Sequence, residues 1–120
     1  MEPDFIRRTK VYRNYFWEFY NEQTDTVKDK IDYVIAIVRT ERKISKTFFE
    51  HMEGIDGIFE IKVKVGNNIF RIFSCFDEGQ LIILFNGFQK KTQKTPKNEL
   101  KKAIELKKQY YAEKEAGNLD

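Results

Sequence analysis

The stretch that decides the fold is GIFEIKVKVGNNIFRIFSCFDEGQLIILFN, residues 57–86. Apolar and polar side chains alternate over 58–65, which is typical of a strand with one buried face. Gly-Asn-Asn at 66–68 and Asp-Glu-Gly at 77–79 are turn signals. We therefore expect three hairpin-linked strands, at 58–65, 69–76 and 80–86, with Gly87 ending the third.

The segments on either side predict the remaining elements. Residues 11–20, VYRNYFWEFY, are almost continuously aromatic and predict a further strand. Residues 24–42 predict a helix, because apolar residues recur at spacings of three and four after the capping residue Thr24. Residues 44–53 predict a short second helix, and a closing helix is expected to begin at Thr95-Pro96. The order β-α-(α)-β-β-β-α indicates an α+β fold, a small antiparallel sheet with helices packed on one face.

Length and composition exclude several kinds of protein. With 120 residues, we expect a single domain over 1–120, with 1–9 loose. Cys75 and His51 are the sole cysteine and histidine, which excludes an intramolecular disulfide, a Cys-based zinc site and HExxH chemistry. We expect His51 at the surface and Cys75 on a strand without a nucleophilic role. Because no apolar signal core or spanning run is present, we expect a cytoplasmic protein with no membrane partner.

Positive charge is concentrated in one segment of the chain. The net charge is +3, but residues 89–108 contain eight lysines and two glutamates, a local charge of +6. A basic stripe of this kind favours a polyanionic partner. A solvated helix face accounts for the same pattern, so the stripe alone does not decide between them.

Cross-strand pairing places a set of polar side chains on one sheet face. Whichever residues form the first turn, Arg71 lies opposite Lys62 or Lys64. The next hairpin places Arg71 opposite Leu84 or Asn86, unless a bulge shifts the register. The face then carries Glu60, Lys62, Lys64, Arg71 and Asn86, with Phe88, Lys90, Lys91 and Lys94 at its rim. Cations and an exposed aromatic suit a phosphodiester backbone and its bases, although a solvent-facing polar surface fits equally well.

Three segments of the chain resemble the RelE/HigB-type toxins of bacterial type II toxin–antitoxin modules. They are GIFEIKV at 57–63, NIFRIF at 68–73 and NGFQKKTQKTPKNE at 86–99. The resemblance covers roughly 11–110 and looks most like the phage-derived HigB branch. It implies a RelE-like fold and a ribosome-dependent endoribonuclease that cleaves mRNA. In such cleavage the 2′-hydroxyl attacks the adjacent phosphate, leaving a 2′,3′-cyclic phosphate and a 5′-hydroxyl, without metal or cofactor.

The resemblance also implies roles for individual residues. Arg71 would stabilise the charged phosphate, Lys62 matches a frequent basic position, and Glu60 would orient that base or act as general base. The RNA-binding candidates are Lys64, Asn86, Phe88, Lys90, Lys91 and Lys94. Asn86 stands where many relatives have histidine, so no histidine acid or base is available there. The implied partners are the ribosome, mRNA and a small helix-turn-helix antitoxin similar to HigA.

Two other functions remain open at this point. The ParE branch has the same fold and poisons DNA gyrase instead of cutting RNA. A non-catalytic, phage-derived module that binds nucleic acid or another protein would also keep the fold, because a fold alone does not fix an activity.

Overall fold

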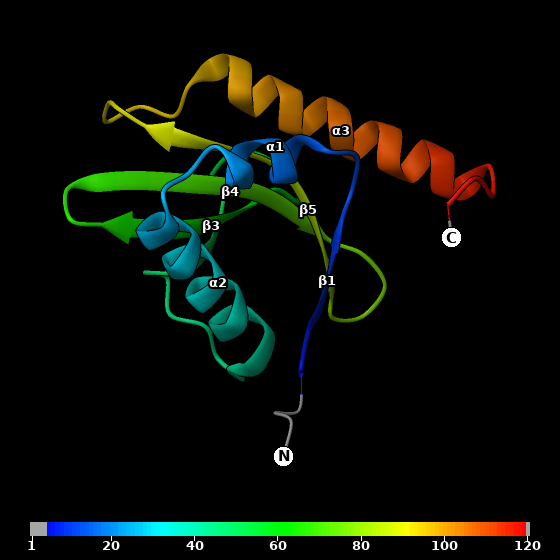
Figure 1. The fold of residues 1–120 in the computed structure, drawn as a ribbon. Coiled ribbons are helices and arrows are strands. Elements are labelled where there is room, and N and C mark those ends of the chain that lie inside the picture. The colour runs from blue at the N-terminus through cyan, green and yellow to red at the C-terminus, as the bar shows by residue number, and fades with distance from the viewer. Residues whose placement is uncertain (1–4, 120) are drawn as a thin grey trace.

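The computed structural model describes residues 5–119, which form a five-stranded sheet and three helices (Figure 1). The strands are β1 (Arg8–Val11), β2 (Phe49–His51), β3 (Phe59–Val65), β4 (Asn68–Phe76) and β5 (Leu81–Lys90). The helices are α1 (Tyr15–Asn21), α2 (Asp25–Thr40) and α3 (Lys97–Glu115). The strand order is β1-β5-β4-β3-β2. The α+β class is confirmed, but the sheet is mixed, because β1 runs parallel to β5.

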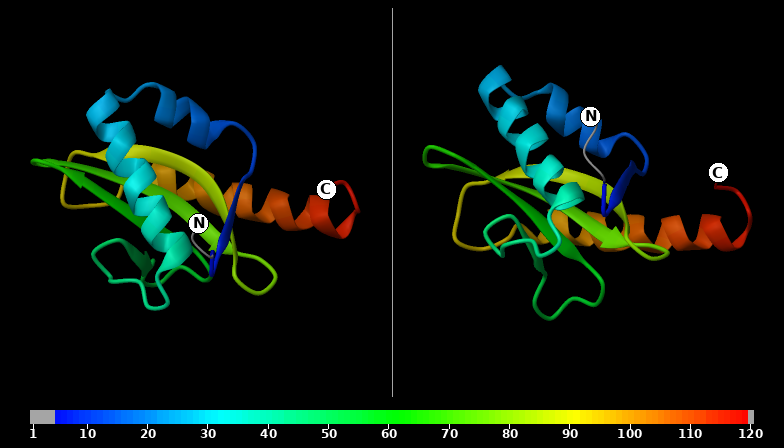
Figure 2. Two further views of the ribbon diagram at one scale, coloured as in Figure 1. Left: turned by 60° about the horizontal axis from the view of Figure 1, so that its bottom comes forward. Right: turned by 90° about the horizontal axis from the view of Figure 1, so that it is seen from below.

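Helices cover both faces of the sheet, so the prediction that they pack on one face is wrong (Figures 1 and 2). On the first face the apolar stripe of α2 packs against β3 and β4; the cluster includes Ile31, Val34, Ile61 and Ile72. On the opposite face Ala103 and Leu106 of α3 pack against the aromatic side chains of β4 and β5. The sheet is therefore the middle layer of three.

Residues 11–20 do not form the predicted strand. Val11 ends β1, and Tyr15–Asn21 forms α1. Phe16 and Phe19 are buried while Trp17 is 44% exposed, and this spacing of three is helical. Arg8 and Thr9, expected to be loose, belong to β1, and residues 1–4 lie outside the described part of the chain.

The predicted helix over 44–53 is also wrong, because its second half forms the edge strand β2. The ring of Phe49 is buried and stacks on that of Phe59 at a centroid distance of 5.1 Å. Phe49 pairs with Ile61 and His51 with Phe59, so these residues satisfy the main-chain groups at the edge of β3. The helix over 24–42 is confirmed as α2, whose N-cap Thr24 accepts a hydrogen bond from Val27 N.

β5 does not end at Gly87 as predicted but continues to Lys90, and it carries a bulge in its centre. Ile72 pairs with Gly87 and Ser74 with Leu84, so two residues of β5, Phe85 and Asn86, lie opposite the single residue Phe73. The extra residue changes the alternation along β5. Arg71 consequently pairs with Phe88 and not with Leu84 or Asn86.

The closing helix α3 begins at Lys97 with Pro96 at its N-cap, one residue later than predicted. A polar network fastens its last turns to the end of β4. Tyr110 donates a hydrogen bond to Asp77 at 2.5 Å, and Lys114 donates one at 2.6 Å. Burial opposes ionisation of Asp77, but the Lys114 and Tyr110 hydrogen bonds hold its pKa below the ordinary value. Neither α3 nor any other helix within residues 5–119 is long and apolar enough to cross a membrane.

Candidate functional site

Two neighbouring ion pairs form the centre of the predicted polar face. The hairpin turn places Lys62 opposite Arg71, as one of the two predicted registers requires. Arg71 Nε lies 3.3 Å from Glu60 Oε2, and Lys62 Nζ donates a hydrogen bond to Glu50 Oε1 at 2.6 Å. The structure thus brings together the three residues proposed as catalytic from the sequence.

The two pairs differ in how far water reaches them. The side chains of Arg71 and Glu60 are 15% and 11% exposed, whereas that of Glu50 is 39% exposed. Lys62 lowers the pKa of Glu50 below its ordinary value, because it donates a hydrogen bond to the carboxylate. Arg71 and Glu60 are therefore a fixed, largely desolvated pair, while Glu50 can leave Lys62 for solvent.

Sequence reasoning missed Glu50, because residues 44–53 were assigned to a helix. The alternation in Phe49-Glu50-His51, with one apolar residue buried and Glu50 directed toward the polar face, is the signal of an edge strand. Three residues are too few for that alternation to outweigh the helical interpretation.

A cavity of about 450 Å³ adjoins the ion pairs at the end of β3 near the β3–β4 turn. Its lining includes four basic residues, Lys30, Lys62, Lys64 and Arg71. Lys30 comes from α2 and was also missed, because its position on an amphipathic helix indicates only an outward side chain. Phe48 and Ile69 give the cavity apolar walls. Together the cations can hold an anionic group against an apolar surface.

Asn86 and Phe88 were predicted to lie on an open surface, but in the structure they are buried. Both side chains point to the face of Arg71, but α3 covers them. Asn86 is 2% exposed and donates to the main-chain oxygen and Oε1 of Glu99, both at 3.0 Å. The ring of Phe88 packs against Phe73 at a centroid distance of 5.2 Å. Neither residue is exposed for stacking or contact with an RNA strand.

The three lysines of the basic segment that were proposed to bind RNA lie in two different places. Lys90 ends β5 opposite Ile69, on the same sheet face as Arg71. Lys91 and Lys94 lie beyond the strand and are exposed in the loop that leads to α3. The sequence placed all three at the rim of the polar face, whereas the structure includes Lys90 in β5 and leaves Lys91 and Lys94 in the loop.

The remaining candidate nucleophiles and metal ligands do not form a site. Burial raises the pKa of the Cys75 thiol to about 11, so the thiolate is scarce at neutral pH. His51 is exposed, as predicted. Within residues 5–119 no three His, Cys, Asp or Glu side chains are placed to hold a metal ion.

The chemistry available on this face is that of a binding site for phosphate esters. Guanidinium and ammonium groups can bind the oxygens of a phosphate, and the planar fork of Arg71 suits a two-point contact. The adjacent carboxylates of Glu50 and Glu60 can accept protons. A face with fixed cations beside carboxylates can therefore both bind a phosphodiester and move a proton next to it.

Comparison with known families matches residues 18–108 to the family described as "Phage derived protein Gp49-like (DUF891)". No curated protein sequence matches the chain closely enough to add a named relative. The family is associated with toxin–antitoxin modules. The matched segment runs from α1 to α3 and contains both ion pairs and the basic loop. Since the match covers well over half of the sequence, the chain belongs to the family of phage-derived Gp49-like proteins.

Proposed function

We propose that this protein is the toxin of a type II toxin–antitoxin module and cleaves mRNA on the ribosome. Membership of the Gp49-like family supports the toxin assignment. The observation that carries the proposed activity is the pair of ion pairs, Arg71 with Glu60 and Lys62 with Glu50, beside a cavity lined by further lysines. The RelE-like topology and the HigB-like branch belong to the same proposal.

RNA binding at this site begins with a competition between phosphate and carboxylate. Lys62 is occupied by Glu50, and Arg71 by Glu60. An incoming phosphate replaces the more exposed Glu50 at Lys62, while the less exposed Glu60 stays and holds Arg71 in position. Lys64, Lys90, Lys91 and Lys94 extend the positive surface along the RNA backbone.

In the proposed cleavage, the 2′-hydroxyl oxygen forms a bond to phosphorus as the bond from phosphorus to the 5′ oxygen breaks. Glu50, released from Lys62, is the exposed carboxylate that accepts the hydroxyl proton. Lys62 donates a proton to the leaving 5′ oxygen, and Arg71 binds the phosphate oxygens where negative charge develops. Glu60 acts through Arg71 and is a positioning residue.

The family implies an antitoxin partner for this chain. We propose that the partner is a small helix-turn-helix protein similar to HigA, encoded beside the toxin. Co-expression is expected to restore growth and to yield a complex that co-purifies. If the neighbouring protein neither restores growth nor co-purifies, this assignment is wrong.

The activity is tested by inducing the wild-type protein, Lys62→Ala and the control Lys43→Ala, an exposed lysine outside the cavity. The wild type and the control are expected to arrest growth and to produce new 5′ ends inside translated messages, and Lys62→Ala to produce neither. Arrest with intact mRNA and accumulated DNA breaks would favour gyrase poisoning. Normal growth with nucleic-acid binding alone would favour a non-catalytic module.

A further inference from the structure

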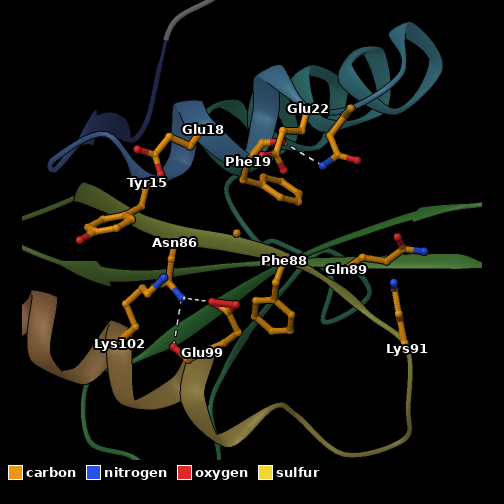
Figure 3. A pocket seen from close by; sticks show the side chains of 12 residues that line it. Tyr15, Glu18, Phe19, Glu22, Asn86, Phe88, Gln89, Lys91, Glu99 and Lys102 are labelled. Atoms are coloured by element: carbon orange, nitrogen blue, oxygen red, sulfur yellow. Dashed lines mark hydrogen bonds between the residues drawn. The ribbon is translucent and has the colours of Figure 1, made fainter.

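A second polar cavity lies at the other edge of the sheet (Figure 3). It has a volume of about 430 Å³ and lies between α1 and α3, with β5 as its floor. β1 pairs with β5 only from Leu81 to Leu84. Beyond Leu84 the outer edge of β5 has no neighbouring strand among residues 5–119. The cavity therefore adjoins a strand edge that no other described strand pairs with.

Most hydrogen-bond donors in this cavity already have partners. The side-chain amides of Asn86, Gln23 and Gln89 donate to Glu99, to the Phe19 carbonyl and to Asn68, respectively. The ammonium of Lys102 lies over the ring of Tyr15, 4.9 Å from its centroid. Lys91, at the far rim, is the exception (Figure 3). The amide donors therefore have protein partners, and the free N–H groups of the cavity belong mainly to the exposed ammonium groups of Lys91 and Lys102.

Three side chains that line the cavity present acceptors without a partner within residues 5–119. Asn86 is 2% exposed, and its buried Oδ1 has no hydrogen-bond partner within the described residues. Its amide orientation is fixed, because both partners of Nδ2 are oxygen acceptors of Glu99. The carboxylates of Glu18 and Glu22 also have no ion pair or hydrogen bond within residues 5–119. A group that contacts these acceptors must therefore be a donor.

The two glutamates also lie in electrostatically unfavourable positions. They are four residues apart on α1, so their like charges face one another along the helix. Glu22 is in addition the C-cap of α1, where the helix dipole disfavours a negative charge. A cation between α1 and α3 would relieve both effects. A phosphate beside Glu18 and Glu22 would add to them, which makes a nucleic acid the wrong ligand for this part of the cavity. Lys91, proposed above to contact RNA, lies at the far rim.

We propose that this cavity binds an arginine side chain of a partner polypeptide whose main chain lies extended along the free edge of β5. A guanidinium carries a positive charge and five N–H donors, which matches unpaired carboxylates and an unpaired amide oxygen. Tyr15, 37% exposed at the cavity wall, offers a ring on which the guanidinium stacks. Strand addition supplies main-chain hydrogen bonds, and the arginine supplies the specificity.

Lys102 marks the position in which a cation is stable. It extends from α3 toward Asn86 in Figure 3, and its ammonium already contacts the Tyr15 ring. Because the Lys102 side chain is exposed and flexible, an arginine displaces it and then reaches Asn86. Lys102→Ala removes this competing cation, and we expect it to tighten binding by about two- to fivefold.

The test is an NMR titration of the full-length protein with two matched peptides, acetyl-Thr-Val-Arg-Val-Thr-amide and the same peptide with citrulline in place of arginine. The arginine peptide is expected to shift the main-chain amide signals of Gly87 and Gln89 and the side-chain amide of Asn86. The citrulline peptide is expected to bind roughly tenfold more weakly, since it lacks the charge. Glu18→Gln with Glu22→Gln should remove this difference, while the control Glu105→Gln, which does not line the cavity, should preserve it.

Three results would overturn the proposal. Equal binding of the two peptides would show that the carboxylates select no cation. Spermidine binding as tightly as the arginine peptide would identify a site for a free polyamine. Uridine monophosphate shifting the same signals while the peptides shift none would identify a nucleotide site. Both glutamates are exposed, so their variants should keep the wild-type spectrum elsewhere.

Discussion

Replacing Arg71 with alanine should affect stability as well as activity, because its partner Glu60 remains. The two side chains are 15% and 11% exposed, and the carboxylate would lose the cation that lies 3.3 Å away. Breaking a fully buried pair costs about 3–5 kcal/mol, and we expect about 2 kcal/mol for this partly solvated one. With an unfolding entropy of ~0.25 kcal/mol/K for a chain of this length, the melting temperature falls by about 8 °C.

A double-mutant cycle separates the structural role from the catalytic one. Arg71→Ala with Glu60→Gln removes the unpaired charge, so we expect its stability to lie within about 1 kcal/mol of the wild type. Its cleavage rate should remain roughly 10²–10³ lower than that of the wild type, because the phosphate still lacks the guanidinium. Thermal melts and cleavage assays on all four proteins measure both quantities. If Arg71→Ala has the same melting temperature as the wild type, the ion pair does not stabilise the fold and the reasoning fails.

Three further predictions concern other parts of the chain. Gly87→Ala should destabilise the protein by about 1–3 kcal/mol in thermal melts, because an added Cβ would lie 2.7 Å from Cγ of the buried Phe19 ring. Asp77 has a lowered pKa in the folded protein, so its stabilising contribution is present above about pH 4 and is lost as the pH falls through that folded-state pKa. Asp77→Asn should remove this acid-sensitive part of the stability, which acid unfolding of both proteins measures. Lys91→Ala should lower RNA affinity and reduce the slope of log affinity against log salt concentration by about 0.7. The ratio of wild-type to variant affinity should therefore rise by about threefold when the salt is lowered from 200 to 50 mM, which filter binding at both concentrations measures.

The central hairpin could be predicted from the sequence because its signals agree. Strict alternation and the Gly-Asn-Asn turn signal narrowed the partner of Arg71 to Lys62 or Lys64, both on one face, and the structure selects Lys62. The helix α2 followed in the same way from its capping residue and apolar stripe. Where propensity, periodicity and turn chemistry predict the same element, that element is found in the tertiary fold.

The predictions that the structure contradicts fail because they depend on long-range packing, which no local sequence pattern encodes. Aromatic residues around Phe16 have strand propensity, but they form a helix because only that periodicity places Phe16 and Phe19 on the core. The bulge at Phe85 and Asn86 is defined by their pairing opposite Phe73, which the residue types alone do not specify. α3 covers Asn86 and Phe88 because it packs on the second face of the sheet, a long-range contact that the local sequence around these residues does not encode.

The most direct test of the proposed activity is cleavage of mRNA in purified, translating ribosome complexes. We compare the wild type with Arg71→Ala/Glu60→Gln, the variant expected to keep its stability. The account predicts that the wild type cuts the message and leaves a 2′,3′-cyclic phosphate and a 5′-hydroxyl, and that the variant cuts roughly 10²–10³ more slowly. Cleavage by the variant at the wild-type rate, or no cleavage by a wild-type protein that still arrests growth in cells, would contradict it.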